Sequence, residues 1–167
     1  MIAMWTKTNL SYLAGIIDGE GCFSLYRTKQ DGCNPVARGY YWKAVLRITN
    51  TEIELMEWIT ANFGGSVGTH HKKSQRLRPI HQWKALSNLM RELLPKLIPY
   101  LILKKPHAKI LLKALDLLRQ RTGGNYRKGA MRPYEMELAE LRNELVSRNA
   151  FRHRTGRYAH LDTPPVT

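Results

Sequence analysis

The feature that most constrains the fold is a change of periodicity that occurs twice in the same order along the chain. Residues 9–18 carry apolar side chains at three- and four-residue steps, which predicts an amphipathic helix. Residues 22–28 and 41–49 then alternate apolar and polar side chains, which predicts two strands. The second unit repeats this order as a helix and a hairpin, over residues 53–63, 66–73 and 78–85. Two such units predict an α+β fold in which one sheet packs against helices. We expect a single domain over residues 1–149 and a basic, poorly ordered tail over 150–167.

Polar and glycine residues mark where the predicted helices begin and end. Thr8 or Asn9 is the expected N-cap of the first helix, and residues 51–54 (Thr-Glu-Ile-Glu) match a capping box. The glycines at 64–65 are expected to end the second helix, and Ser87 is expected to cap the third. The remaining helices are predicted over residues 88–98, 106–121 and 134–147.

The composition favours a polyanionic partner. Lys and Arg number 27 against 13 Asp and Glu, a formal net charge of +14 that is typical of proteins that bind nucleic acid. Apolar residues make up 43% of the chain, which is enough for a hydrophobic core. No apolar run reaches the roughly 18 residues of a membrane span, no secretory leader is evident, and two cysteines make no disulfide framework. We therefore expect an intracellular protein without a membrane partner, in the cytoplasm of a prokaryote or in an organelle.

The first predicted helix carries two glycines, Gly15 and Gly19, four residues apart on one face. Glycine within a helix costs about 0.5–1 kcal/mol relative to alanine, so two of them suggest a packing purpose. These positions either let a second copy of the helix approach closely, in a homodimer with a twofold axis, or pack against the chain's own core.

Residues 13–21 read Leu-Ala-Gly-Ile-Ile-Asp-Gly-Glu-Gly, and this run resembles the signature motif of the LAGLIDADG homing endonucleases. A second run at 99–105, Pro-Tyr-Leu-Ile-Leu-Lys-Lys, is similar to a segment before the long helix of the single-motif members. The resemblance implies a homodimer with an αββαββα fold and a saddle-like antiparallel sheet. It places the motif helix at the dimer interface, with Asp18 expected to bond nearby backbone. The interface residues implied are Leu13, Ala14, Gly15, Asp18 and Gly19.

The resemblance also implies a catalytic centre at the end of the motif helix. Glu20 takes the position of the family's metal-binding acid, which is commonly Asp, and the Gly19 carbonyl can join it. Such hard oxygen ligands suit Mg²⁺, with Mn²⁺ as a second candidate. Lys104 matches a lysine near the scissile phosphate, Asn50 matches a polar residue that orders the attacking water, and Arg47 is a candidate for a further positive charge. From the residues alone, Lys104 could equally be an ordinary surface lysine, and Asn50 a turn residue at the end of a strand.

The exposed face of the predicted sheet is expected to bind double-stranded DNA at a long, pseudo-palindromic site. A twisted antiparallel ribbon fits the major groove, where Arg and Lys read guanine and Gln reads adenine, and loop residues hold phosphates. The candidate DNA-binding residues are Ser24, Tyr26, Thr28, Lys29, Arg38, Tyr41, Lys43, Arg47, His70, Lys72, Arg76, Arg78, Gln82 and Lys84.

Three functions fit these features. The leading hypothesis is a metal-dependent, site-specific DNA endonuclease of intron homing, which by the resemblance leaves 3′ overhangs. The alternatives are an RNA-binding intron maturase with the same fold, and a non-catalytic DNA-binding regulator that needs no metal. Glu20 and Lys104 favour the enzyme, and metal-dependent cleavage would separate it from the other two.

Overall fold

The computed structural model describes residues 5–29, 40–70, 78–119 and 133–154. The elements, in chain order, are α1 (Lys7–Glu20), β1 (Gly21–Lys29), β2 (Tyr40–Asn50), α2 (Ile53–Phe63), β3 (Ser66–His70), β4 (Ile80–Ala85), α3 (Ser87–Leu97), α4 (Lys105–Arg119) and α5 (Pro133–Arg154). The four strands form one antiparallel sheet in the order β1-β2-β4-β3. The predicted α+β fold of two helix–strand–strand units is therefore confirmed.

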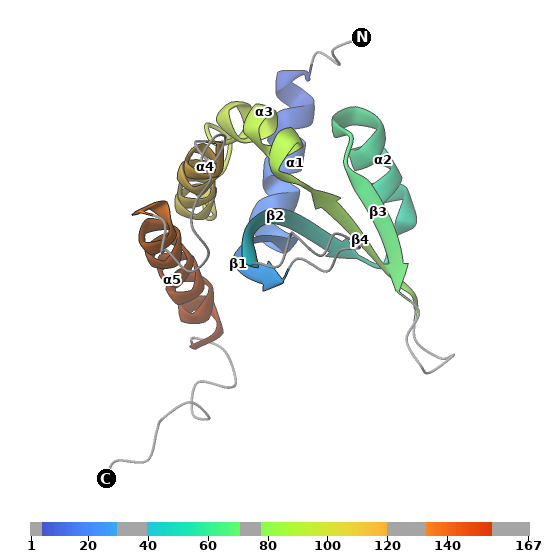
Figure 1. Cartoon of the computed structure of the whole chain (residues 1–167). Helices are drawn as coiled ribbons and strands as arrows, with labels where there is room; N and C mark the ends of the chain where they lie inside the picture. Colours follow the sequence, from blue (N-terminus) through green and yellow to red (C-terminus); the bar gives the residue numbers. More distant parts are fainter. Residues whose placement is uncertain (1–4, 30–39, 71–77, 120–132, 155–167) are drawn as a thin grey trace.

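The helices α1 to α4 pack against the sheet, and α5 lies beyond β1 at the edge of the sheet (Figure 1). The predicted apolar positions of α1 meet those of the strands in this core: Leu13, Ile17, Phe23 and Ile48 are almost completely buried. Because both periodicities place their apolar side chains in one layer, the sheet keeps its other face for polar residues. No helix within the described ranges is long and apolar enough to cross a membrane.

The turn after α2 depends on two glycines, as predicted. Gly64 and Gly65 have φ values of 77° and 94°, which L side chains rarely adopt. The fully buried Trp83 packs against this turn, and its indole N–H donates to the Gly64 carbonyl at 2.8 Å. A Cβ on Gly65 would lie 2.6 Å from the indole nitrogen, so only glycine fits there.

The predicted helix starts are wrong in detail. Thr6 caps α1 by accepting the Asn9 N–H at 3.1 Å, so the helix begins earlier than expected. The capping box at 51–54 does not form: Glu52 is the N-cap of α2, and the Thr51 hydroxyl donates to the Glu52 carboxylate at 3.3 Å. The Glu52 N–H donates to the Asn50 side chain at 2.9 Å. Ser87 is the first residue of α3 and not its cap, a place taken by Leu86.

Two side chains differ from the predictions in their exposure, and the last helix is longer than expected. Val45 lies on the polar face by register, as predicted, but is only 2% exposed. Met136, predicted on the apolar stripe of α5, is 59% exposed. The helix itself continues to Arg154, beyond the predicted boundary of the tail. Residues 155–167 lie outside the described residues, as do most of the predicted loops.

Candidate metal centre and nucleic-acid interface

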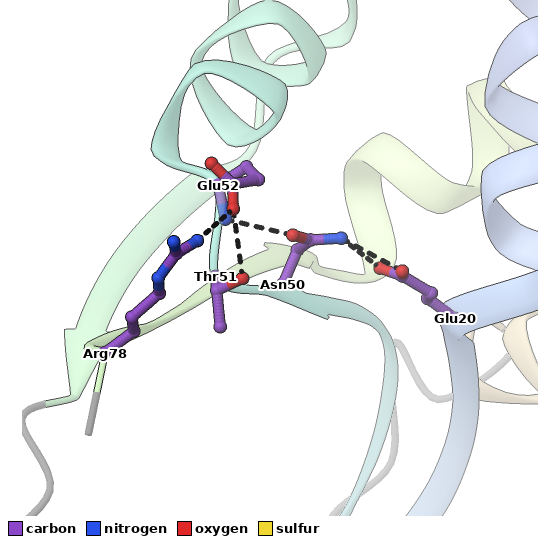
Figure 2. A network of polar contacts seen from close by, with 5 residues as sticks. All are labelled: Glu20, Asn50, Thr51, Glu52 and Arg78. Carbon is purple, nitrogen blue, oxygen red and sulfur yellow. Dashed lines mark hydrogen bonds and ion pairs between the residues drawn. The ribbon is translucent and has the colours of Figure 1, made fainter. Parts of the chain in front are cut away.

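Glu20 is the last residue of α1, and its exposed side chain faces the end of β2. Asn50, the last residue of β2, donates from its side-chain nitrogen to both Glu20 carboxylate oxygens, at 2.9 and 2.7 Å (Figure 2). The structure thus brings together two residues that are separated by the whole first hairpin. A carboxylate held this way is oriented before any ligand arrives.

The orientation of Asn50 is fixed by a second bond. Its carbonyl oxygen accepts the backbone N–H of Glu52 at 2.9 Å, so the amide nitrogen must point toward Glu20 (Figure 2). Asn50 is therefore a turn residue whose side-chain nitrogen contacts the Glu20 carboxylate. Its role in ordering an attacking water, which the resemblance implied, stays a prediction. The two-residue step from Asn50 to Glu52 is an Asx turn, a signal that the sequence contains.

Asp18 occupies the other side of the same helical turn. Its carboxylate accepts the backbone N–H groups of Ile102, Lys104 and Leu103, at 2.7, 2.8 and 3.2 Å. Partial burial by itself raises the pKa of Asp18, but these three donors and the Lys104 ammonium outweigh it and hold the pKa below its usual value. The predicted bonding of Asp18 to backbone is confirmed, and the partners come from the segment that leads into α4.

Lys104 is not an ordinary surface lysine. The residue is 8% exposed, and its Nζ donates to the carbonyls of Ile17 at 2.7 Å and Gly19 at 3.4 Å. The ammonium therefore sits against the negative end of the α1 dipole, one residue from Glu20. The Gly19 carbonyl, a predicted metal ligand, therefore already accepts a hydrogen bond from the Lys104 ammonium. Through these two hydrogen bonds, Lys104 joins the end of α1 to the segment that leads into α4.

The Glu20 carboxylate fits a divalent metal site in part. Glu20 offers a solvent-exposed carboxylate, and Mg²⁺ commonly takes one or two carboxylates while it keeps several waters. No cluster of three or more His, Cys, Asp or Glu side chains occurs among the described residues.

The predicted dimer face of α1 divides into two parts. Leu13 and Ala14 are buried in the protomer's own core, at 0% and 1% exposure, so they cannot meet a second copy directly. Gly15 and Gly19 are exposed, and a Cβ at either position would meet nothing within 4 Å. These two glycines therefore do not serve packing against the described part of the chain, which disfavours the second of the two alternatives for them.

The polar face of the sheet carries three basic residues, Lys43, Arg47 and Lys84, none of which has an ion pair among the described residues. The four strands contain no Asp or Glu. Arg47 lies directly opposite Lys84, and Tyr26 directly opposite Lys43. The Arg47 guanidinium lies 5.9 Å from the centre of the Tyr26 ring, on this face. Like charges in directly opposed positions destabilise a sheet, so this arrangement suits an anionic partner.

The other candidate DNA-binding residues differ in their positions and contacts. Ser24, Gln82 and His70 share the polar face by register, and Gln82 donates to Thr49 at 3.3 Å. Arg78 instead pairs with Glu52 at 3.1 Å, a partner that the sequence gave no sign of (Figure 2). The residues Thr28 and Tyr41 stand opposite each other at the far end of β1 and β2. The Lys29 side chain and the residues Arg38, Lys72 and Arg76 lie outside the described residues.

Comparison with known proteins identifies the family. The family model described as LAGLIDADG endonuclease matches residues 13–113, which is more than half of the chain. The chain belongs to the LAGLIDADG endonuclease family. No functionally curated protein matches this endonuclease by sequence.

Solved structures agree with this LAGLIDADG fold. The homing endonuclease I-CvuI, in complex with the I-CreI target and Mg and with uncleaved DNA, is 19% identical and has a TM-score of 0.64, with 85% of this chain and 82% of that chain covered. The archaeal intron-encoded homing endonuclease I-Vdi141I, complexed with DNA, is 21% identical, with a TM-score of 0.61 and 84% of each chain covered. The LAGLIDADG homing endonuclease I-SmaMI bound to cleaved DNA is 18% identical, and 83% of this chain covers only 42% of that one, at a TM-score of 0.53. The present LAGLIDADG chain thus spans most of the first two proteins and less than half of the third.

Proposed function

We propose that this LAGLIDADG endonuclease is a homodimeric, Mg²⁺-dependent enzyme of intron homing that cuts both strands of a long DNA site and leaves 3′ overhangs. The observation that carries the proposal is one exposed, oriented carboxylate, Glu20, at the end of a helix with an open glycine face. We also propose a single domain over residues 1–149, since one buried cluster runs from Leu10 to Leu145. An intracellular location, in a prokaryotic cytoplasm or an organelle, belongs to the same proposal because the DNA target is there.

The homodimer is supported by the empty space beside the two glycines of α1 and by exposed apolar side chains near the end of this helix. A second α1 can approach Gly15 and Gly19 closely, because no atom of the described chain occupies the space beside them. Such a crossing brings a second Glu20 to the first. Ile102 and Leu103, which Asp18 fixes beside the end of α1, are 83% and 58% exposed and add apolar surface to this region.

The chain's own residues support hydrolysis at this centre. Glu20 supplies the carboxylate, Asn50 orients it, and the Lys104 ammonium keeps positive charge beside the Gly19 carbonyl. A divalent ion held by Glu20 would activate water and stabilise the leaving 3′ oxygen. Arg47 takes its place in the DNA-binding face in this proposal, since its guanidinium lies over Tyr26.

The basic face of the sheet supports the binding of duplex DNA. A twisted antiparallel ribbon can enter the major groove, and Lys43 and Lys84 offer hydrogen-bond donors for guanine along it. Gln82 offers an amide for adenine once it releases Thr49. Arg78 would have to break its ion pair with Glu52 to contact a phosphate, so we expect it to contribute least to the DNA affinity.

The test is cleavage of a randomised duplex library with Mg²⁺, by the wild type and Glu20→Ala. We expect the wild type to cut one long site and Glu20→Ala to lose about 10³-fold in rate, because several kcal/mol of metal-dependent stabilisation disappear. DNA affinity should persist, since the change removes negative charge. Glu54→Ala is the matched control, because Glu54 is also an exposed glutamate beside the network, at the start of α2.

Two results would contradict the proposal. Cleavage by Glu20→Ala at the wild-type rate would remove Glu20 from the chemistry. If neither protein cuts while both bind tightly, binding and splicing of the host intron RNA would favour the maturase, and sequence-specific DNA binding alone would favour the regulator.

A further inference from the structure

A cavity of about 230 Å³ lies at the edge of the sheet, between β1 and α5. It opens beside the polar face, because Ser24, Tyr26 and Arg47 of that face line it. The opposite wall comes from α5, with Arg142, Val146 and Asn149. The volume is smaller than the roughly 300–1,000 Å³ of small-molecule sites, so it suits a compact group.

The polar atoms around this cavity are hydrogen-bond donors in excess. Arg47 and Arg142 bring two guanidiniums, which carry donors only. The Arg47 Nε is buried and has no hydrogen-bond partner in the part of the chain that the structure describes. The Asn149 side chain donates to the Phe23 carbonyl at a long 3.5 Å, which leaves its second N–H for a ligand. No carboxylate lines the cavity, so its complement is an anion.

The carboxylates of α5 do not neutralise these arginines, since they are engaged elsewhere. The ion pairs of the helix are Glu135 with Arg27, Glu137 with Lys113, and Glu144 with Arg148. The fourth glutamate, Glu140, acts on Lys113, where Glu137 chiefly and Glu140 in addition raise the pKa of that ammonium. Arg142 is exposed and has no ion pair among the described residues. The side of α5 toward β1 therefore carries Glu135, which is paired with Arg27, and Arg142, which has no ion pair in the described part of the chain.

We propose that this cavity binds a phosphate of the DNA backbone, held by Arg142 and Asn149 of α5 together with Arg47 of the sheet. The inference rests on the proposed DNA-binding function and extends the interface beyond the strands to α5. Two guanidiniums and an amide match the geometry of phosphate oxygens. A backbone phosphate fits better than a base edge, because the cavity lies at the margin of the face that would enter the groove.

The test is the salt dependence of binding to an arbitrary DNA duplex, with the full-length chain. Each phosphate contact contributes about 0.9 to the slope of log affinity against log salt, so Arg142→Ala should lower the slope by about 0.9 per protomer between about 50 and 200 mM salt. Arg142→Lys keeps the charge and should keep most of the slope. Arg148→Ala is the matched control, because it removes the same charge from the same helix but from a residue paired with Glu144.

Each outcome decides between stated possibilities. An unchanged slope in a folded Arg142→Ala protein, or an equal decrease in Arg142→Ala and Arg148→Ala, would overturn the phosphate site. If the wild type binds the duplex weakly and without salt dependence, the proposed DNA function fails instead. Nuclear magnetic resonance of the Arg142 Nε–H separates the phosphate sources: we expect a shift with duplex. A shift with inorganic phosphate that duplex does not displace would overturn the DNA assignment.

Discussion

Two carboxylates stand two residues apart at the end of α1, and their surroundings differ sharply. Asp18 receives three backbone N–H donors from the segment that leads into α4. Glu20 receives one side-chain amide, from Asn50, and is otherwise exposed. The first carboxylate has used its accepting capacity on the fold, whereas the second keeps lone pairs for a ligand. The two acids of one motif thus divide into a carboxylate used by the fold and a carboxylate open to a ligand.

The difference lies in the donors that each carboxylate meets. Backbone N–H groups cannot turn away, so a carboxylate that faces several of them is fixed and stays ionised. A side-chain amide can yield when a metal arrives. The side of the helical turn that carries Glu20 is therefore open to a ligand. The side that carries Asp18 joins α1 to the segment that leads into α4.

Asp18→Asn offers the strongest way to break this comparison. The amide NH₂ that replaces one oxygen would face a backbone N–H, so we expect a loss of about 1–3 kcal/mol in the free energy of unfolding. Cleavage per folded molecule should change little, the reverse of the effect at Glu20. Urea unfolding checks the prediction, with Asp116→Asn as the control, since Asp116 is exposed on α4. Equal stability of the two variants would contradict the structural role of Asp18.

Low pH provides a second test of the structural role of Asp18. Because the pKa of Asp18 is lowered in the folded state, its contribution is complete above the unfolded value of about 3.9 and is lost as pH falls through the lower folded value. The stability gap between the wild type and Asp18→Asn should therefore narrow at acid pH. A gap that stays constant down to about pH 2 would show that the charge of Asp18 is not what stabilises the turn.

How much of this site the sequence predicts depends on how local each contact is. The periodicities locate the strands and the buried side of α1, because they depend on neighbouring residues only. The glycines Gly64 and Gly65 are predictable for the same reason. The burial of Lys104 is not, since its partners Ile17 and Gly19 are more than eighty residues away. The capping box predicted at 51–54 is wrong, because the Thr51 hydroxyl bonds to the Glu52 carboxylate and the N-cap of α2 is one residue later than the box requires.

Gly15→Ala tests whether the open face of α1 serves a second copy. A methyl group at this position meets nothing within 4 Å, so alanine should stabilise the protomer by about 0.5–1 kcal/mol through helix propensity. In a homodimer, the same methyl should hold the two helices apart and weaken dimerisation. Analytical ultracentrifugation and thermal unfolding at low concentration measure the two effects. Asn143→Ala, at an exposed position of α5, should also stabilise its helix but leave the dimer unchanged. Dimerisation that is equally strong in Gly15→Ala would contradict a close crossing at α1.

Lys84→Gln carries the comparison to the sheet, where Lys84 and Arg47, like Glu20, have no ion pair among the described residues. Lys84 lies directly opposite Arg47, and no acidic residue occurs in the four strands. Removing one of two opposed positive charges should therefore raise the free energy of unfolding by about 0.2–1 kcal/mol, while DNA affinity falls because a donor to the groove is lost. Lys109→Gln makes the same chemical change at an exposed position of α4 and should do neither. If Lys84→Gln gained stability and bound DNA as well as the wild type, the opposed charges would have no functional reason, and the basic face would not be the DNA-binding surface.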